Sequence, residues 1–315
     1  QWVFSGRASE ITSDGFIDRA HANLKGYQAS VQRNGQSKWG NWKALLTSFG
    51  GNERTYQAWN GSPHEIVFGA SKQDLLNYAA RNYLSEAEIQ NLLNSGRTYN
   101  YFTYANQVDQ YQQHHQQAHF QWSKNKWLWQ SALFHTRGAG YFEEQKLGAE
   151  TFQYGLDSIL ISSNGQPQWT QEMDAVRRRW LDNHFVGVVY GLNYQPLSNL
   201  KFTFGGAVNS YSGAHFGELI WAQFASNSQI YDRYYDNNAL KQEASAYLKT
   251  NYQIQNWDLT LDLQYRGINY RFLGVDQVSG VLTDVTQTVN YQFFNPKFAV
   301  AKNFERQPVF ASVGI

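Results

Sequence analysis

The sequence predicts an all-β fold, a transmembrane antiparallel up-and-down β-barrel with long loops and a short helical insertion. Three observations predict it. Extended segments alternate apolar and polar residues, as strands with two different faces do. Short turns and long connections follow each other in rotation along the chain. Aromatic residues make up 17% of the 315 residues and charged residues only 16%, a balance typical of proteins that sit between lipid and water.

Composition excludes several other classes of protein. The net charge of +1 lacks the basic surplus of a nucleic-acid-binding protein. The absence of cysteine excludes disulfides and thiolate metal sites. No run of about 18 apolar residues predicts a transmembrane helix, so a membrane would be crossed by strands of about 9–11 residues.

Alternation is clearest in segments that short polar turns join in pairs. Within 257–266, apolar residues occupy most odd positions and polar residues most even positions. The expected strands are 24–33, 39–49, 111–122, 127–137, 185–194, 200–209, 244–254, 257–266, 298–304 and 308–315. The expected turns are Asn34-Gly35, Lys124–Lys126, Pro196–Asn199, Gln255-Asn256 and Glu305-Arg306.

The order of these connections indicates a barrel. In an up-and-down barrel, alternating short and long connections place every turn at one rim and every long loop at the other. The alternation of residues alone also fits a soluble barrel, whose apolar face would fill the core. The apolar stripes are repeatedly close to the length that crosses a membrane, which favours the membrane barrel.

Aromatic residues lie beside the short turns, where a membrane barrel carries an aromatic belt. They are Trp122, Trp127, Tyr194, Tyr252 and Trp257. The alternative is that aromatic residues favour the ends of strands in any sheet.

One segment, about 71–96, departs from the strand pattern. Ser71 with Asp74, and Ser85 with Glu88, each match a helix-capping box, and Gly96 is a plausible helix stop. The sequence therefore predicts two short helices within an extracellular loop, with Leu75, Leu76, Ala79 and Tyr83 on a shared face.

Several segments at the expected strand ends resemble the TonB-dependent receptors of the bacterial outer membrane. They are 50–59 (GGNERTYQAW), 97–100 (RTYN), 109–114 (DQYQQH), 134–141 (FHTRGAGY), 179–183 (RWLDN), 234–237 (YYDN) and 294–297 (FNPK). None is a strict signature alone, but their order and positions make the set fairly specific, and it spans nearly the whole chain.

The resemblance implies a barrel of about 22 strands, an N-terminal plug domain and a segment that contacts the energy-coupling protein TonB. Roughly a dozen strands are expected here, so residues 1–315 are interpreted as part of the barrel domain without its plug. The implied function is uptake of a ferric siderophore, with cobalamin or a glycan as alternatives. The implied partners are TonB, through the plug, and outer-membrane lipids.

Candidate ligand-binding residues lie in the expected extracellular loops. Arginine guanidinium groups beside an aromatic ring can bind an anionic chelate or, equally, anionic lipid headgroups. Aromatic and polar mixtures suit flat or sugar-like ligands, although packing between loops would use the same residues. The candidates are Trp59, Tyr99, Tyr101, Arg177, Arg178, Trp180, Trp221, Tyr231, Arg233, Tyr234 and Tyr235.

No catalytic or metal site is predicted. His115 and His119 share a face of one strand, but no third ligand lies at a suitable spacing, so hydrogen-bonded wall residues are expected. The carboxylate pair Glu143-Glu144 has nothing to orient it for acid–base work. No cofactor motif occurs. The competing hypotheses are a soluble β-rich carbohydrate-binding module and a barrel enzyme, and a module of that kind would stay folded without detergent.

Overall fold

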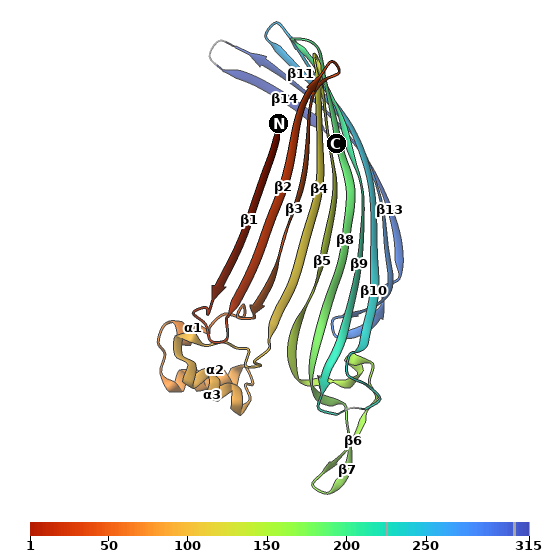
Figure 1. The fold of residues 1–315 in the computed structure, drawn as a ribbon. Helices are drawn as coiled ribbons and strands as arrows, with labels where there is room; N and C mark the ends of the chain where they lie inside the picture. The colour runs from red at the N-terminus through yellow and green to blue at the C-terminus, as the bar shows by residue number, and fades with distance from the viewer. Residues whose placement is uncertain (225, 305–306, 315) are drawn as a thin grey trace.

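The computed structural model describes residues 1–224, 226–304 and 307–314, most of which belong to one antiparallel sheet. Within the described residues the sheet has 12 strands, paired in the order β1-β2-β3-β4-β5-β8-β9-β10-β11-β13-β14 with β12 beside β11 (Figure 1). Their bounds are β1 Trp2–Ser13, β2 Ala22–Ser37, β3 Gly40–Tyr56, β4 Val108–Lys124, β5 Trp127–Glu150, β8 Glu172–Leu197, β9 Leu200–Ala222, β10 Asp232–Ile254, β11 Trp257–Val278, β12 Val281–Asp284, β13 Gln287–Asn303 and β14 Pro308–Gly314.

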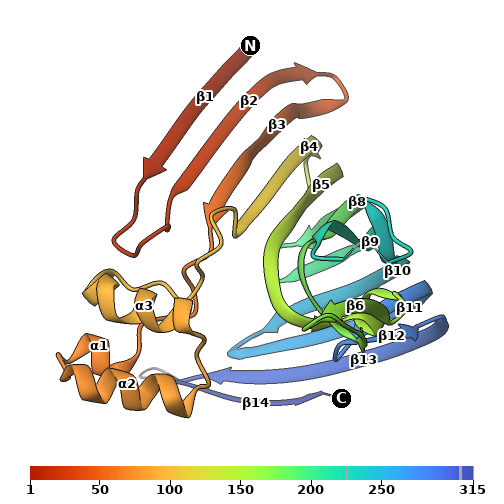
Figure 2. The ribbon, with the colours of Figure 1, turned by 90° about the horizontal axis from the view of Figure 1, so that it is seen from below.

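The sheet bends round into a C-shaped wall when it is seen along the strands (Figure 2). Each long strand pairs with the next one along the chain, and the edge strands β1 and β14 do not pair with each other among the described residues. Short turns gather at one end, while the helices and the hairpin of β6 (Ile159–Ser163) and β7 (Gln166–Thr170) lie at the other (Figure 1). The expected antiparallel barrel wall, with its turns and long connections at opposite rims, is confirmed.

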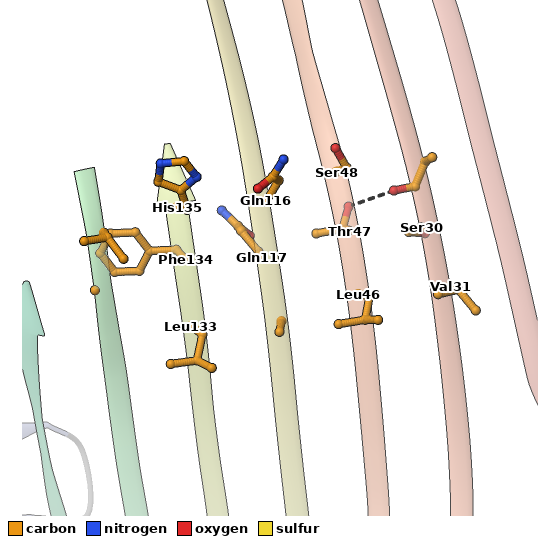
Figure 3. A pocket seen from close by; sticks show the side chains of 14 residues that line it. Ser30, Val31, Leu46, Thr47, Ser48, Gln116, Gln117, Leu133, Phe134 and His135 are labelled. Carbon is orange, nitrogen blue, oxygen red and sulfur yellow. Dashed lines mark hydrogen bonds between the residues drawn. The ribbon is translucent and has the colours of Figure 1, made fainter. Parts of the chain in front are cut away.

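The register identifies the outward, convex face of this wall. Leu133, Val188 and Val208 are direct partners across β5, β8 and β9, so their side chains share one face. Leu133 is 60% exposed and Val208 50% exposed. Large apolar side chains exposed in rows over many strands argue against a soluble fold. Figure 3 shows two neighbouring rows, with Leu133 in one and His135 in the next.

The outward apolar band has the length of a membrane-crossing strand. Along β9 it extends over nine residues, from Leu200 to Val208, and the next outward residue is Ser210. A tilted strand needs about 9–11 residues to cross the hydrocarbon layer, so the band is long enough. On β11 the band similarly ends before Asn269.

The expected aromatic belt lies on the outward face beside the short turns. Trp127 and Tyr194 are direct cross-strand partners whose rings stack with centres 3.9 Å apart. Trp257 and Tyr252 occupy outward positions on the adjoining strands β11 and β10. Amphipathic rings of this kind occupy the interface between hydrocarbon and water.

The concave face is polar at the same height. Arg266 donates two hydrogen bonds to the Glu243 carboxylate, at 2.7 and 2.9 Å, and Lys241 lies 3.4 Å from the same group. Asn251 donates to the Thr260 hydroxyl over 2.8 Å. The wall therefore presents apolar groups outward and hydrogen-bonding groups inward, as a lumen-forming barrel does.

Two expectations about strand limits were wrong. Asn34 and Gly35 lie within β2, and the chain turns at Lys38-Trp39 instead. Gly35 leaves room for the ring of Trp42, which would overlap any Cβ at that position. The strands also continue well past the apolar band, because the hydrogen-bonded ladder persists where both faces have become polar. The expected turn at Glu305-Arg306 and the last residue, Ile315, lie outside the described residues.

The segment between β3 and β4 contains a small helical unit. Its helices are α1 His64–Val67, α2 Lys72–Arg81, α3 Glu86–Ser95 and the 3-10 turn η1 Gly96–Thr98. Both capping boxes form at Ser71 and Ser85. The core of the unit consists of Ile66, Ala79, Leu92 and Tyr99. Tyr83 lies beyond the end of α2 and is 94% exposed, so the expectation that it shares one helix face with Leu75, Leu76 and Ala79 was wrong. Among the described residues, no helix has the length and apolarity needed to cross a membrane.

Candidate ligand-binding site

A recess of about 650 Å³ opens on the concave face at the long-loop end of the wall. Alternating residues of β3, β4, β5, β8, β9, β10 and β11 point into it, so the curvature of the sheet brings together residues far apart in sequence. Its aromatic and cationic side chains are Tyr111, Phe142, Arg179, His215, Tyr235 and Phe272. Its carboxylates are Glu53, Asp109 and Asp276.

Arg179 is the cation of the recess. Its Nε donates a hydrogen bond of 3.0 Å to the Tyr235 hydroxyl. Its guanidinium carbon lies 5.3 Å from the centre of the Tyr235 ring and 5.8 Å from that of Phe142. Among the described residues its terminal N–H groups make no hydrogen bond, and the nearest carboxylate is Asp276 at 3.9 Å. A planar cation held between rings with free donors can bind a flat anionic group in a bidentate manner.

Tyr235 and His215 supply further polar groups beside Arg179. Burial raises the pKa of the Tyr235 phenol, so the hydroxyl stays protonated at neutral pH. Nδ1 of His215 lies 3.1 Å from Oδ1 of Asn237, and Nδ2 of Asn237 donates to the backbone oxygen of Val275. This chain of hydrogen bonds fixes the imidazole plane on the wall of the recess.

Carboxylates outnumber cations on this part of the wall. Burial raises the pKa of Asp109, and the Gln57 hydrogen bond opposes that shift only in part. Asp276 is paired with Arg179, whereas Glu53 has no cation within ion-pair distance on the described chain. The wall around Arg179 is therefore acidic, with one cation at its centre.

Two ion pairs hold the strands that form the recess. Nε of Arg177 donates to Glu144 over 2.8 Å, and Nε of Arg178 donates to Glu143 over 2.7 Å. Burial alone would raise the pKa of each glutamate, but the hydrogen bonds and cations around them hold it below its usual range. Burial and the Glu143 hydrogen bond raise the pKa of Tyr104 to about 12. Both glutamates therefore serve as ionised partners that fix β5 to β8.

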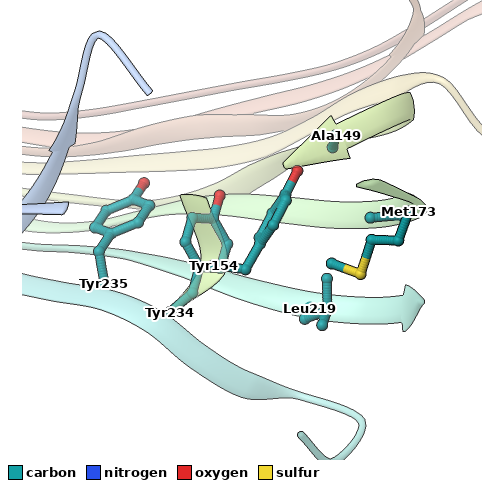
Figure 4. Close-up of a cluster of buried hydrophobic side chains, with 7 residues drawn as sticks. Ala149, Tyr154, Met173, Leu219, Tyr234 and Tyr235 are labelled. Atoms are coloured by element: carbon teal, nitrogen blue, oxygen red, sulfur yellow. The ribbon is translucent and has the colours of Figure 1, made fainter. Parts of the chain in front are cut away.

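A buried hydrophobic cluster (Figure 4) adjoins the recess, because Tyr235 belongs to both. Met173, Leu219, Tyr234 and Tyr235 pack together there, along with Tyr154 of the 3-10 turn η2 Thr151–Tyr154. The rings of Tyr154 and Tyr234 meet edge to face with centres 4.9 Å apart. Tyr235 therefore belongs both to this cluster and to the recess, which fixes the position of its hydroxyl.

The structure divides the candidate residues of β8 and β10 between two faces. Tyr235 lines the recess, while Arg177 is buried in its ion pair and Tyr234 in the cluster. Three others point outward: Arg178 lies over the Tyr141 ring, Nε1 of Trp180 donates to Glu218, and Arg233 lies over the Phe216 ring. Of these three, Trp180 also borders the recess. The expectation that these positions lie in loops was wrong, because all of them are on strands.

The remaining candidates lie at the end of β9, beside β10 and in the segment between β3 and β4. Trp221, at the end of β9, and Tyr231, beside β10, are exposed. Tyr99 is buried in the helical core, while Trp59 and Tyr101 are exposed beside it. None of these residues lines the recess.

Sequence reasoning did not select most of the recess. The missed residues are Glu53, Asp109, Tyr111, Phe142, Arg179, His215, Asn237, Phe272 and Asp276. One signal was present: period-two alternation extended back from Val188 places Trp180 and Arg178 on its apolar face and Arg179 on the polar one.

The described residues contain no group of three or more His, Asp or Glu side chains placed to hold a metal ion. His115 and His119 instead contact Thr136 and Gln117, at 3.0 and 2.9 Å.

Solved structures share this architecture. Over 99% of its length, the chain superposes on the ferric-catecholate import receptor Fiu of Escherichia coli K12 with a TM-score of 0.64 and 11% identity, and covers 50% of that chain. The chain has the barrel fold of siderophore receptors. The ferric yersiniabactin uptake receptor FyuA of Yersinia pestis gives a TM-score of 0.58 at 8% identity, with 41% of that chain covered. FpvA of P. aeruginosa, bound to heterologous pyoverdines, gives 0.58 at 10% identity, with 37% covered.

The chain thus spans half or less of the length of these three solved receptors. No protein-family model and no curated protein matches the sequence.

Proposed function

We propose that this chain forms part of the barrel wall of a TonB-dependent receptor in the bacterial outer membrane, and that the receptor imports a ferric siderophore. The long-loop rim captures the chelate, and the recess around Arg179 and Tyr235 binds it on the lumen side. Release and passage depend on a plug domain that TonB pulls from the periplasm. The wall contributes binding and gating, and it carries out no covalent chemistry.

The observation that carries this proposal is the position of the recess. It lies on the lumen face, beyond the apolar band, at the rim where the long connections gather. Recesses that combine aromatic walls with a few fixed polar groups are typical ligand sites. The likeness to a ferric-catecholate import receptor and a ferric yersiniabactin uptake receptor supports the same conclusion. The outward apolar band supports a membrane barrel over a soluble carbohydrate-binding module.

The charge of the recess favours one class of chelate. Glu53, Asp109 and Asp276 surround the single cation Arg179, so a polyanionic tris-catecholate would be repelled by most of this wall. A neutral ferric trihydroxamate can accept hydrogen bonds from Arg179 and Tyr235 without that repulsion. We therefore place neutral or cationic chelates first among the candidate ligands.

The test uses the full receptor in a strain that lacks its other siderophore receptors. Tryptophan fluorescence titration would measure affinity for a ferric trihydroxamate and a ferric tris-catecholate, and labelled iron would measure import. Arg179→Ala is expected to weaken binding of the preferred chelate at least tenfold, because Arg179 is the one Lys or Arg among the described residues that line the recess. Arg233→Ala, an outward cation on the other face, is the matched control and should bind normally.

Three results would overturn the proposal: no ferric chelate binds at micromolar concentration, import persists without TonB, or both variants behave alike. Saturable binding of cobalamin or a glycan in place of every chelate would reassign the ligand. Stronger binding of the tris-catecholate than of the trihydroxamate would overturn the charge argument alone.

A further inference from the structure

The hydrogen bonds around His215 fix which nitrogen of its imidazole carries a proton. Asn237 is the direct partner of His215 across β9 and β10, and it is 2% exposed. Its Nδ2 donates to the backbone oxygen of Val275 over 3.3 Å, and a carbonyl oxygen can only accept. The amide oxygen Oδ1 of Asn237 therefore faces His215, at 3.1 Å from Nδ1. Because Oδ1 also accepts only, Nδ1 of His215 is the nitrogen that carries the proton.

The other ring nitrogen of His215, Nε2, is left for a ligand. The imidazole lines the recess, and Nε2 makes no hydrogen bond within the part of the chain that the structure describes. Above the pH range in which imidazoles take up a second proton, Nε2 then carries a lone pair and accepts a hydrogen bond. His215 therefore contributes an acceptor to the recess, and the backbone of β11 sets its orientation through Asn237.

Two donors lie close to this acceptor. On β8 and β9, Arg179 is the direct partner of Gly217, two residues from His215. Diagonal neighbours of this kind share one face of the sheet, and their Cα atoms lie about 7–8 Å apart. The terminal N–H groups of Arg179 make no hydrogen bond on the described chain. The Tyr235 hydroxyl accepts from Nε of Arg179, which leaves its own proton for a further acceptor.

We propose that the recess recognises a secondary amide in the backbone of the chelate, with His215 accepting its N–H and with Arg179 and Tyr235 donating to its carbonyl oxygen. A trans amide directs these two groups to opposite sides. With hydrogen bonds of about 2.9 Å on both sides, its partner atoms lie roughly 8 Å apart. That span is comparable with the diagonal spacing of Arg179 and His215.

This inference rests on the proposed function and narrows its ligand class. Among neutral ferric trihydroxamates, it selects those whose hydroxamate groups are joined by secondary amides. An ester linkage would offer a carbonyl to Arg179 but no donor to Nε2 of His215, which would lose water without gaining a partner. An ammonium group would supply the donor, but it has no acceptor for Arg179 and carries the same charge.

The experiment compares two synthetic ferric trihydroxamates that differ only in their linking groups, secondary amides in one and esters in the other. Tryptophan fluorescence titration of the full receptor at pH 8, above the usual titration range of imidazole, would give both affinities. We expect the amide chelate to bind about tenfold more tightly, a difference of about 1.4 kcal/mol. His215→Phe keeps a planar ring but removes the acceptor, so the preference should fall below twofold.

His119→Phe is the matched control. Ala118 is the direct partner of the outward Leu133, so the next residue along β4, His119, points to the concave side, and it lies outside the recess. This variant should keep the tenfold preference of the unsubstituted receptor. Because His215→Phe could also disturb folding, ¹⁵N NMR of the unsubstituted receptor provides a second measurement, and it should place the His215 proton on Nδ1.

Four results would each overturn the inference. They are equal affinity of the unsubstituted receptor for both chelates, a preference retained in His215→Phe, a preference lost in His119→Phe, and a His215 proton on Nε2 in place of Nδ1. Failure of the unsubstituted receptor to bind either chelate would instead overturn the proposed function on which the inference depends, so the two failures are distinguishable.

Discussion

The side chains of Arg179 and Tyr235 are hydrogen-bonded to each other, although the strands that carry them are not adjacent and β9 lies between them. Arg179 lies on β8 and Tyr235 on β10, and Gly217 of β9 is the direct partner of both. A Cβ at Gly217 would overlap the rings of Tyr234 and Tyr235. The absent side chain is what lets the Tyr235 ring lie over β9 and bring its hydroxyl to 3.0 Å from Nε of Arg179.

Gly217→Val should therefore disrupt ligand binding while the barrel still folds. The added methyl groups displace the Tyr235 ring, and Arg179 loses both its hydrogen bond and a stacking partner. We expect chelate affinity to fall at least tenfold by fluorescence titration. Gly267→Val is the control, because a Cβ at Gly267 would meet only the far end of Tyr265, at 4.0 Å. Normal binding by Gly217→Val would show that this contact does not shape the site.

The sequence predicts the strands well only within the apolar band. Within the band, alternation predicted paired strands such as 200–209 and 257–266 and placed Trp127 and Tyr194 outward, because lipid on one side and water on the other impose period two. Beyond the band that contrast ends. The segment that carries Arg177, Arg178 and Trp180 was therefore interpreted as a loop, although the ladder of β8 continues through it.

The recess was harder to predict for a second reason. Tyr111, Arg179 and Phe272 lie on β4, β8 and β11, and only the curvature of the sheet brings them together. Alternation along a strand predicts which face of the sheet a residue lies on. It does not predict how strongly the sheet curves, and that curvature brings residues of seven strands together. The helical unit was predictable because a capping box is encoded locally, as at Ser71 and Ser85.

The outward face can be tested with one substitution in the middle of the band. Phe204 is 44% exposed on the outward side of β9. Phe204→Arg should cost about 2–4 kcal/mol, the usual penalty for an arginine facing lipid near the midplane. The measurement is the urea dependence of folding into lipid vesicles, followed by the gel shift between folded and unfolded barrel.

Ala207→Arg is the matched control, since Ala207 points to the concave face of the same strand. It should fold with a midpoint close to that of the unsubstituted protein, because a lumen-facing cation stays hydrated. Equal destabilisation by both variants would contradict the assignment of the two faces.

The hydrophobic cluster that adjoins the recess should be sensitive to cavities. Met173 is 1% exposed and packs against Tyr154 and Leu219. Met173→Ala should cost about 2–5 kcal/mol of local stability, as a large-to-small change in a packed core does. Limited proteolysis of 145–175 would detect it as faster cleavage. Trp169→Ala is the control, because Trp169 is 67% exposed on the β6–β7 hairpin, and it should leave cleavage of the neighbouring segments unchanged. If both variants accelerated cleavage equally, the packing role of Met173 would be contradicted.

Acid should loosen the long-loop end of the wall before it affects the apolar band. Glu143 and Glu144 have folded-state pKa values below their ordinary value of 4.5. Their contribution to stability is therefore complete above about pH 4.5 and is lost as the pH falls through the lowered values. Hydrogen exchange, corrected for the intrinsic rate, should become faster in 141–146 and 176–180 below pH 4.5, while 200–208 stays protected.

Glu143→Gln separates this ion pair from general acid unfolding. The amide keeps the size of the side chain but leaves Arg178 without its counter-charge, which should cost about 1–3 kcal/mol. In this variant, exchange near 178 should already be faster at pH 7 and should change less on acidification. Gln145→Glu, which adds a carboxylate two residues further along the same face of β5, should retain the response of the parent protein. An unchanged acid response in Glu143→Gln would show that another group, and not the Glu143–Arg178 pair, controls the loosening of this rim.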